Sequence, residues 1–348
     1  MDFPIIIGPL VFIFSRIEGR NIMVEFITNL NSTINGFVWG LPMMVLILGV
    51  GVYLSARCGF PQFTHFGHIM KNTIGKAFEK TEKKEGAVSP FKAMCTALAA
   101  SIGTGNIAGV SGAIAIGGPG AVFWMWVSAL LGMCTKFSEV TLAVKYRERN
   151  KEGDWVGGPM YYITNGLGKK WKWLACVFAG FGALAAFGIG NMTQINTIAG
   201  TINTAIGGFI PTTEHEQTII AWFVAIICAL ICAFVLLGGI QRLADVCALL
   251  VPVMAVIYIA ASLIVIAVNI SGIPAVFAAI VKGAFNPASV AGGLAGVGIK
   301  TALTKGVGRG IFSNEAGLGS APIAHAAADV DHPVKQGIYG VFEVFMDT

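Results

Sequence analysis

The sequence predicts an all-α integral membrane protein. Hydrophobic residues make up 55% of the 348 residues, charged residues make up only 12%, and the mean hydropathy is +0.75. A soluble domain carries about 25% charged residues, so this composition is typical of a chain that crosses a lipid bilayer many times. The net charge of +5 is concentrated in a few loops, which argues against nucleic acid as a partner.

Seven apolar segments are long enough to cross a membrane, since a spanning helix needs about 20 apolar residues. An eighth begins near Val334 and is too short to cross before Thr348. Residues 1–22 are interpreted as an extension upstream of a start at Met23, or as a poorly ordered tail. The loop segments 60–80 and 272–290 are expected to form interfacial helices. The candidate spans are 36–56, 92–116, 120–145, 172–200, 217–239, 244–269 and 297–327.

Lysine and arginine concentrate in the connections on one side of the predicted membrane. Cytoplasmic loops carry such an excess, so we expect loops 57–91 and 145–172 to be cytoplasmic and residues 24–35 to lie outside. The opposite connections contain a single basic residue, Lys282. The predicted organisation is a tail (1–22), a peripheral first transmembrane helix with its cytoplasmic loop (23–91), a first five-helix repeat (92–269) and the start of a second, incomplete repeat (270–348).

Two of the spans are interrupted by polar residues. The segments ALAASIGTGNIAGVSGAIA and GVGRGIFSNEAGLGSAPIA place Gly, Ser and Asn where an apolar helix should continue. Glycine in a helix interior costs about 1 kcal/mol relative to alanine, and a buried amide needs partners. Five spans separate the two segments, an odd number, so the second copy enters the membrane from the other side. Paired interruptions of this kind point to the binding site of an inverted-repeat transporter.

Unwinding a helix at membrane depth frees backbone N–H and C=O groups, which must line a polar cavity or be buried in protein. Freed N–H groups favour a carboxylate, and freed carbonyls favour a cation such as sodium or a substrate ammonium. A zwitterionic amino acid with a sodium ion suits both. The alternative is that the glycines only allow close helix packing. The matching polar residues Asn106, Asn314 and Glu315 favour a ligand site.

A third polar patch, GNMTQIN at 190–196, lies late in the fourth span. Asn191 and Gln194 have i, i+3 spacing and share a helix face. These amides either bond another helix or contact a substrate. Lys136 and Glu139, also i, i+3, are expected to form an intramembrane or near-cytoplasmic pair that acts as a structural gate and does not bind the ligand directly.

Several motifs in order resemble the alanine/glycine–cation symporter family from about Met23 onward: GTGNIAGV, GGPGAVFWMW, GGPMYYI, GNMTQIN and GIFSNEAGLGSAPIAHAAA. The family is similar in fold to the bacterial leucine transporter, with one extra helix and then five plus five inverted-repeat helices. The resemblance implies a sodium-coupled transporter in a bacterial-type plasma (inner) membrane. Its partners would be alanine or glycine, sodium and lipid, with no cofactor other than the coupling ion.

The resemblance also implies roles for individual residues. Backbone N–H groups of Thr104 and Gly105 would hold the substrate carboxylate, and Gln194, with Asn191 beside it, would face the substrate. Sodium would be held by Ser101 and Asn106, with the carbonyls of Ala99 and Ile102 serving a second sodium. Phe312, Ser313 and Glu315 would meet the substrate ammonium and the cation.

The length of the chain departs from the family pattern, because three further helices of the fold are absent. A truncated second repeat is therefore expected, and transport by this chain alone is in question. The rival interpretations are a proton-coupled transporter of the same fold, for which Glu315 is a candidate, and a channel or sensor derived from a transporter. An enzyme is not expected, because no nucleophile or metal motif falls at one membrane depth.

Overall fold

The computed structural model describes residues 21–76, 86–285 and 299–348. These ranges are predominantly helical, as predicted, with a short antiparallel hairpin in which β1 (Glu148–Arg149) pairs with β2 (Trp155–Val156). The predicted N-terminal tail lies almost entirely outside the described residues. The chain divides into two compact units. Unit 1 comprises Met1–Gly40 and Ala179–Gly239, and unit 2 comprises Leu41–Phe178 and Ile240–Thr348.

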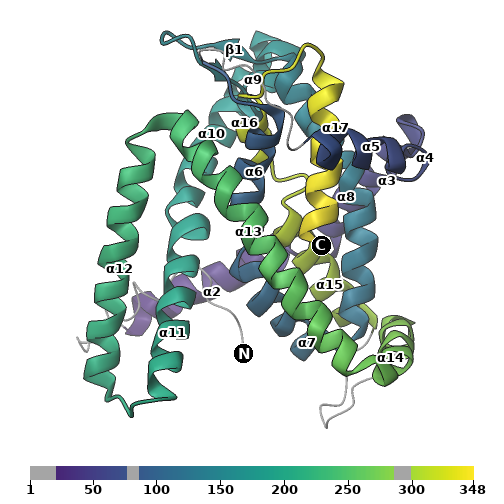
Figure 1. Ribbon diagram of the computed structural model, residues 1–348. Helices are drawn as coiled ribbons and strands as arrows, with labels where there is room; N and C mark the ends of the chain where they lie inside the picture. Colours follow the sequence, from purple (N-terminus) through teal and green to yellow (C-terminus); the bar gives the residue numbers. More distant parts are fainter. Residues whose placement is uncertain (1–20, 77–85, 286–298) are drawn as a thin grey trace. The chain divides into compact units, whose positions relative to one another are not determined.

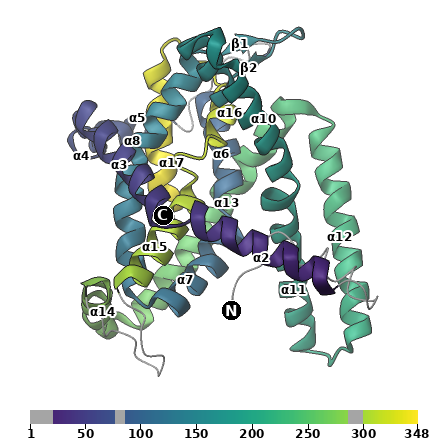
Figure 2. The ribbon, with the colours of Figure 1, turned by 180° about the vertical axis from the view of Figure 1, so that it is seen from behind.

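In unit 2 the long helix α8 (Gly120–Lys145) packs against α3, α14, α15 and α17 (Figures 1 and 2). The shorter helices α6 and α16 pack against each other, and α6 also contacts α17. The bounds of the other helices that lie in or enter unit 2 are α3 (Leu41–Arg57), α4 (Pro61–Thr64), α5 (Phe66–Thr73), α6 (Pro90–Ser101), α7 (Val110–Gly117), α9 (Pro159–Tyr162), α10 (Lys172–Ala186), α13 (Gly239–Val268), α14 (Ile273–Phe285), α15 (Ile299–Asn314), α16 (Ala321–His325) and α17 (Pro333–Asp347).

Small residues allow the partners of α8 to approach its backbone closely. A Cβ at Gly306 of α15 would collide with Ala121 O, and one at Gly310 would collide with Ser128 Oγ. The spacing of this pair is that of a small-xxx-small contact. A Cβ at Gly120 would strike the backbone of Gly283 in α14. Close packing is therefore the physical role of these glycines.

Unit 1 contains α2 (Asn21–Val38), α11 (Thr193–Gly207) and α12 (Glu214–Leu236). Helices α11 and α12 lie side by side and antiparallel (Figure 2). Thr213 caps α12 through a reciprocal pair with Glu216, in which the Thr213 backbone N–H donates to Glu216 Oε2 at 2.8 Å. Asn203 Nδ2 donates to Gln217 O at 3.0 Å, which joins the two helices.

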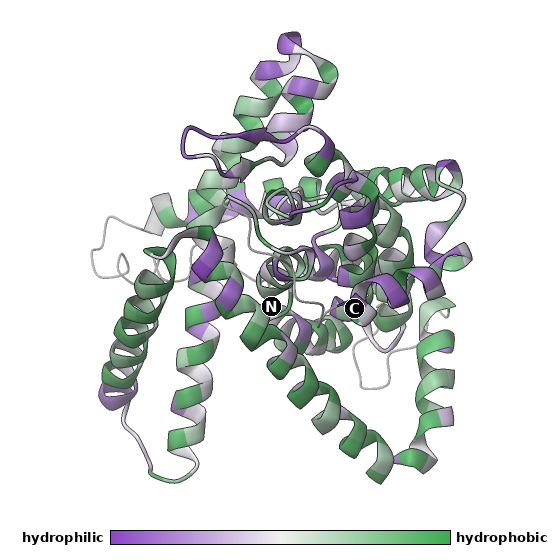
Figure 3. Ribbon diagram, turned by 45° about the horizontal axis from the view of Figure 1, so that its top comes forward, coloured by the Kyte–Doolittle hydropathy of each residue, from purple (hydrophilic) through white to green (hydrophobic). Residues whose placement is uncertain are grey.

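Five helices among the described residues are long and apolar enough to cross a membrane: Val24–Arg57, Gly120–Lys145, Lys169–Gly207, Glu214–Leu236 and Gly239–Val268. A sixth results if the bent pair Pro90–Ser101 and Gly105–Gly117 counts as one span. Green, hydrophobic ribbon runs along the long helices, and purple gathers at loops and helix ends (Figure 3). Exposed apolar side chains such as Phe234 and Leu263 are typical of lipid-facing helices.

The predicted spans agree with these helices except for segment 297–327. There α15 ends at Asn314 and the short α16 follows after a turn, so no single helix covers the segment. The expected helix in 60–80 is observed as α4 and α5, and that in 272–290 as α14, which ends at Phe285; residues 77–85 and 286–298 lie outside the described part of the chain.

Candidate functional site

The first predicted interruption is present between α6 and α7, which are bent by 51°. Helix α6 ends at Ser101, Ile102 has an extended backbone, and a π-helical turn covers Gly105–Gly109. The Gly103 N–H donates to Asn106 Oδ1 at 2.9 Å, and the Asn106 N–H donates to Gly103 O at 3.1 Å. Asn106 therefore bonds Gly103 across the interruption through both its side chain and its backbone.

These two hydrogen bonds change what the neighbouring carbonyls can do. In a continuous helix the N–H of residue i bonds the carbonyl of residue i−4, so Gly103 would bond Ala99 and Asn106 would bond Ile102. Both donors bond elsewhere. The carbonyls of Ala99 and Ile102 thus lose their usual partners, and these are the two carbonyls predicted to serve a sodium ion.

The second interruption follows α15. Asn314 Oδ1 accepts from the Ala316 N–H at 3.0 Å, and Glu315 has a φ of 53°. A left-handed backbone at a residue other than glycine is uncommon and costs free energy. Ser320 Oγ donates to the Glu315 carboxylate, so this carboxylate is hydrogen-bonded within the turn that follows α15.

One side chain joins the two interruptions. Asn106 Nδ2 donates to Ser313 Oγ at 3.1 Å, to Asp347 O at 2.9 Å and to Asp347 Oδ1 at 2.9 Å. Asn314 Nδ2 donates to Thr348 Oγ1 at 3.4 Å. Asp347 was not among the predicted site residues. It lies at the end of α17, where no motif in the local sequence indicates a site. Its carboxylate lies where the first interruption, the end of α15 and the end of α17 meet.

Arg309 is a second residue that the sequence predictions missed. Its guanidinium lies against the first interruption, because a Cβ at Gly105 or Gly109 would collide with it. It also lies over the Phe312 ring, 5.1 Å from the centroid. Its Nε and Nη2 are buried and have no hydrogen-bond partner among the described residues. The available signal was a basic residue directly before the second polar motif.

The remaining predicted residues fall into two groups. Ser101 is buried at the end of α6, where its Oγ donates to Leu98 O at 3.4 Å, and Thr104 precedes the π-helical turn. Asn191 and Gln194 belong to unit 1, where a π-helical turn covers Gly188–Met192 and leads into α11. Asn191 Nδ2 donates to Ala186 O at 3.1 Å, a bond within its own segment.

The predicted pair of Lys136 with Glu139 is not a salt bridge in the described structure, although the two charges interact electrostatically. Lys136 Nζ pairs instead with Glu343 Oε1 of α17 at 3.2 Å, and both side chains are completely buried. Glu139 Oε2 accepts from the Gly317 N–H at 3.1 Å. Residues three apart on a helix are neighbours, but α17 offers Lys136 a partner in the protein interior, where an unpaired charge is costly.

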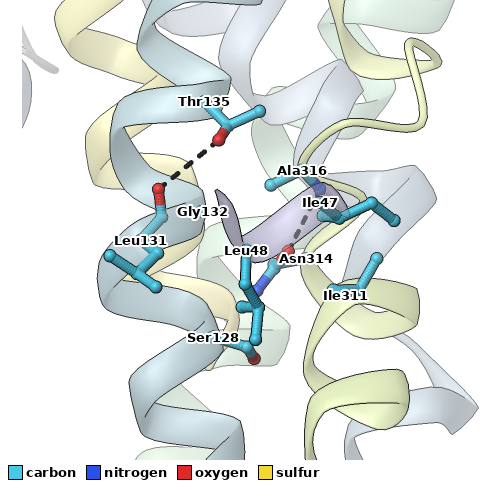
Figure 4. A pocket seen from close by; sticks show the side chains of 9 residues that line it. All are labelled: Ile47, Leu48, Ser128, Leu131, Gly132, Thr135, Ile311, Asn314 and Ala316. Carbon is cyan, nitrogen blue, oxygen red and sulfur yellow. Dashed lines mark hydrogen bonds between the residues drawn. The ribbon is translucent and has the colours of Figure 1, made fainter. Parts of the chain in front are cut away.

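A cavity of about 10 Å³ lies beside the second interruption (Figure 4). This volume holds about one water molecule and no amino acid. The described residues also contain no group of three or more His, Cys, Asp or Glu placed to hold a metal ion; a sodium ion would use hydroxyl, carbonyl and amide oxygens instead. The cavity is lined by Ile47, Leu48, Ser128, Leu131, Gly132, Thr135, Ile311, Asn314 and Ala316.

Comparison with known proteins gives a consistent result. A profile of the sodium:alanine symporter family matches residues 24–348. The chain is 46% identical over 327 residues to the sodium/alanine symporter AgcS of Methanococcus maripaludis, covering 93% of this chain and 68% of that protein. It is 44% identical over 326 residues to the amino-acid carrier protein AlsT of Bacillus subtilis, covering 94% and 65%. An uncharacterised transporter of Haemophilus influenzae is 46% identical over 323 residues, covering 92% and 67%. The chain thus spans about two thirds of the length of these relatives.

Proposed function

We propose, from the premise that this chain belongs to the sodium:alanine symporter family, that it serves the sodium-coupled import of a small neutral amino acid, alanine or glycine, by alternating access. Members of this family are multi-pass membrane transporters and not enzymes. The observation that carries the proposal is the Asn106 bridge, which holds one interrupted helix to the other. Ligand sites of inverted-repeat transporters lie where such helices meet.

The proposed architecture is the leucine-transporter-like inverted repeat of five plus five helices after one extra helix. It is supported by two interruptions five spans apart and by the placement of both in unit 2. The proposed setting is a bacterial-type plasma membrane, with loops 57–91 and 145–172 in the cytoplasm and residues 24–35 outside. The distribution of lysine and arginine supports this orientation.

The substrate carboxylate is proposed to bind at the first interruption, at the backbone N–H groups of Thr104 and Gly105. Arg309 adds a positive charge at the same place. Its Nε–H and one N–H of Nη2 lie on the same edge of the planar guanidinium, the edge that binds a carboxylate with two parallel hydrogen bonds. Both nitrogens are buried without a hydrogen-bond partner among the described residues, so a carboxylate there would satisfy two buried donors.

The coupling ion is proposed to bind between the two interruptions. The carbonyls of Ala99 and Ile102, Ser101 and the amide oxygen of Asn106 are the proposed ligands from the first. Ser313 Oγ and the Asp347 carboxylate, which share Asn106 as a neighbour, add oxygens from the other side. Oxygen donors of this kind suit a hard cation. Glu315 and Phe312 are proposed to line the side of the substrate ammonium.

The test is uptake of labelled alanine into proteoliposomes under an inward sodium gradient, with a potassium gradient as the control. Alanine and glycine should compete for uptake, and alaninamide, which lacks the carboxylate, should not. Uptake driven equally well by a proton gradient without sodium would replace sodium coupling by proton coupling. Saturable binding without stoichiometric flux would favour a sensor or channel.

The role of Gln194 needs a separate comparison on the same helix. Gln194→Ala should weaken alanine binding by about 1–3 kcal/mol through a lost buried hydrogen bond. Asn203 is the matched control, because its amide joins α11 to α12, so Asn203→Ala should lower thermal stability and leave affinity unchanged. If Gln194→Ala behaves like Asn203→Ala, the amide of Gln194 is structural.

A further inference from the structure

A second polar cluster lies away from the two interruptions, in the interior between α8, α16 and α17. Lys136, His325, Gln336 and Glu343 are all completely buried. Lys136 Nζ lies 3.2 Å from Glu343 Oε1, and His325 Nε2 lies 2.9 Å from Glu343 Oε2. The proposed transport site uses none of these four side chains, yet burying so many polar groups is costly unless each is paired.

The hydrogen bonds of Gln336 fix the protonation of His325. Gln336 Nε2 lies 3.2 Å from Pro90 O and 2.7 Å from His325 Nδ1. A carbonyl can only accept a hydrogen bond, so the atom facing Pro90 O must be the amide nitrogen. That nitrogen has only donors to offer, so it also donates to Nδ1. His325 is therefore neutral, carries its proton on Nε2 and donates that proton to Glu343.

A second proton on His325 would disrupt the hydrogen bond between Gln336 Nε2 and His325 Nδ1. An Nδ1–H needs an acceptor, and Gln336 Oε1 is buried with no hydrogen-bond partner in the described structure. Turning the amide by half a rotation presents Oε1 to the new N–H. The same turn sets two acceptors, Oε1 and Pro90 O, against each other. The bond between Gln336 and Pro90 is then lost.

Pro90 is the first residue of α6, and α6 is the half of the interrupted span that ends at Ser101. The bond from Gln336 thus ties the start of this half-helix to α17. Other contacts at this end are the Ser89 cap, which accepts from the Lys92 N–H at 3.3 Å, the ion pair of Lys92 with Asp245, and the backbone bonds that join Val88 to Ala327 and Asp329. Release of Pro90 O loosens the helix at the end opposite the proposed ligand site.

The surrounding charges are compatible with an added proton. Lys136 and Glu343 balance each other, so a doubly protonated His325 adds one positive charge. Glu139 on α8 and Asp347 on α17 also interact electrostatically with Lys136 and Glu343, and Glu139 interacts with Glu315 in the turn after α15. The other charged or titratable groups on elements packed against α16 and α17 engage elsewhere or are exposed: Lys92 of α6 with Asp245, Cys95 of α6 beside Cys247, Arg309 of α15 at Gly105, and His68 and Lys71 of α5 at the surface.

We propose that His325 is a proton-binding site and that its occupancy is transmitted through Gln336 to the start of α6. With one proton on the ring, α6 is tied to α17 through Pro90 O. With two, the Gln336 amide turns and the tie is released. The first half of the interrupted span is then held more loosely at acidic pH than at alkaline pH. This inference concerns the ligand-free protein and does not depend on which amino acid is transported.

The test is hydrogen–deuterium exchange of the purified protein in nanodiscs between about pH 5 and pH 8, the range in which histidine titrates, without sodium or amino acid. After correction for the chemical exchange rate, amides of α6 should exchange about threefold or more faster at the acidic end, because local opening governs exchange. Amides of α12, in the other unit, should not change. A wild-type α6 whose corrected exchange is independent of pH would overturn the proposal without any variant.

Three variants locate the effect. His325→Gln removes the titration and should abolish the pH response of α6. Gln336→Met removes the link and should leave α6 fast at every pH. His332→Gln is the matched control, because His332 caps α17 from the surface by accepting from the Val334 N–H at 3.3 Å, and it should keep the wild-type response. A pH response that persists in His325→Gln would also overturn the proposal. Failure of alanine uptake, by contrast, would leave all of these outcomes unaffected.

Discussion

The two interrupted helices differ in the chemical groups that they present where the helix is broken. The first contains no charged residue from Ala97 to Gly120 and closes on itself through the Asn106 side chain. The second carries Arg309 and Glu315 and places Glu315 in a left-handed conformation. One therefore offers backbone groups and the other offers charge. The proposed ligands, a zwitterion and a cation, would need both, so under the proposed function neither interruption is a sufficient site without the other.

The difference also shows how each is supported. Asn106 makes its contacts directly at the first interruption. The second has contacts of its own, including the Gly317 N–H that donates to Glu139 Oε2 at 3.1 Å, and Arg147 in addition holds the carbonyls of Ala326 and Ala328 after α16, the former at 2.8 Å. Substitutions at the first should therefore act on ligand affinity, whereas substitution of Arg147, which contacts none of the proposed ligand-binding residues, should act on stability.

The largest expected effect is on affinity, at Gly105. In Gly105→Ala the new methyl collides with Arg309, and because the guanidinium is the far end of a flexible side chain, it moves away and the fold survives. We expect alanine affinity to fall about tenfold or more, as for loss of a charged hydrogen-bonding partner, with little change in the thermal unfolding temperature. The measurement is sodium-dependent binding of labelled alanine alongside thermal unfolding in detergent.

Two controls define this prediction. Gly49→Ala in α3 meets no atom within 4 Å and should be neutral or slightly stabilising, as alanine is in a helix. Gly105→Ala combined with Arg309→Gln should be no weaker in affinity than the worse single variant, because both act on one guanidinium. A loss of stability without a loss of affinity in Gly105→Ala would make the first interruption a packing motif.

The next effect is on stability, at Arg147. Arg147→Lys loses the planar guanidinium that contacts the segment after α16 and stacks 4.1 Å from the Trp155 ring centroid. The free energy of unfolding should fall by about 1.5–3 kcal/mol, the range for hydrogen bonds to a charged group, with alanine affinity unchanged. Arg149 is the matched control, as it stacks on the same ring at 4.5 Å from an exposed position and donates to Gly153 O within its own hairpin, away from the segment after α16. Equal destabilisation by Arg149→Lys would show that the stacking, and not the carbonyl contacts, supports the second interruption.

The smallest effect is expected at the exposed pair before α17. The hydrogen bond from Lys335, 2.7 Å from Asp331 Oδ2, lowers the pKa of Asp331 below its usual value. A lowered pKa in the folded state contributes stability above the unfolded pKa, which is about 3.9, and this contribution is lost as pH falls through the folded pKa. Lys335→Ala should therefore change thermal stability at neutral pH by a barely measurable amount, and by still less as the pH falls through the folded pKa. A large change at pH 7 would mean that this surface pair helps to position α17.

The positions of both interruptions could be predicted because the signal is local. Glycine, serine and asparagine within an apolar run identify the place without knowledge of the fold, and α6 does end at Ser101 and α15 at Asn314. The glycine alternative also proved correct in part, since Gly306 and Gly310 serve close packing. Local sequence alone cannot separate a glycine that faces a backbone from one that faces a guanidinium.

The partners of the polar residues could not be predicted, because they come from distant segments. Lys136 has Glu139 one turn away, yet its ion pair is with Glu343. Asp347 lies in an apolar stretch of α17 with no motif around it. The role proposed for His325 depends on its contact with Gln336 and on the contact of Gln336 with Pro90, which the sequence does not indicate. Tertiary contact determines which of several possible partners each charge meets.

The glycine contacts along α8 have a mechanical consequence. Helices α14, α15 and α17 place Gly283, Gly306, Gly310, Gly337 and Gly340 against it, each where an added Cβ would crowd α8. Helix surfaces packed this closely resist sliding, so we expect α8, α14, α15 and α17 to move together as one rigid body. Such stiffness would confine a transport motion to the edges of this rigid body, where the hydrogen bonds of Asn106 and Gln336 can break and re-form.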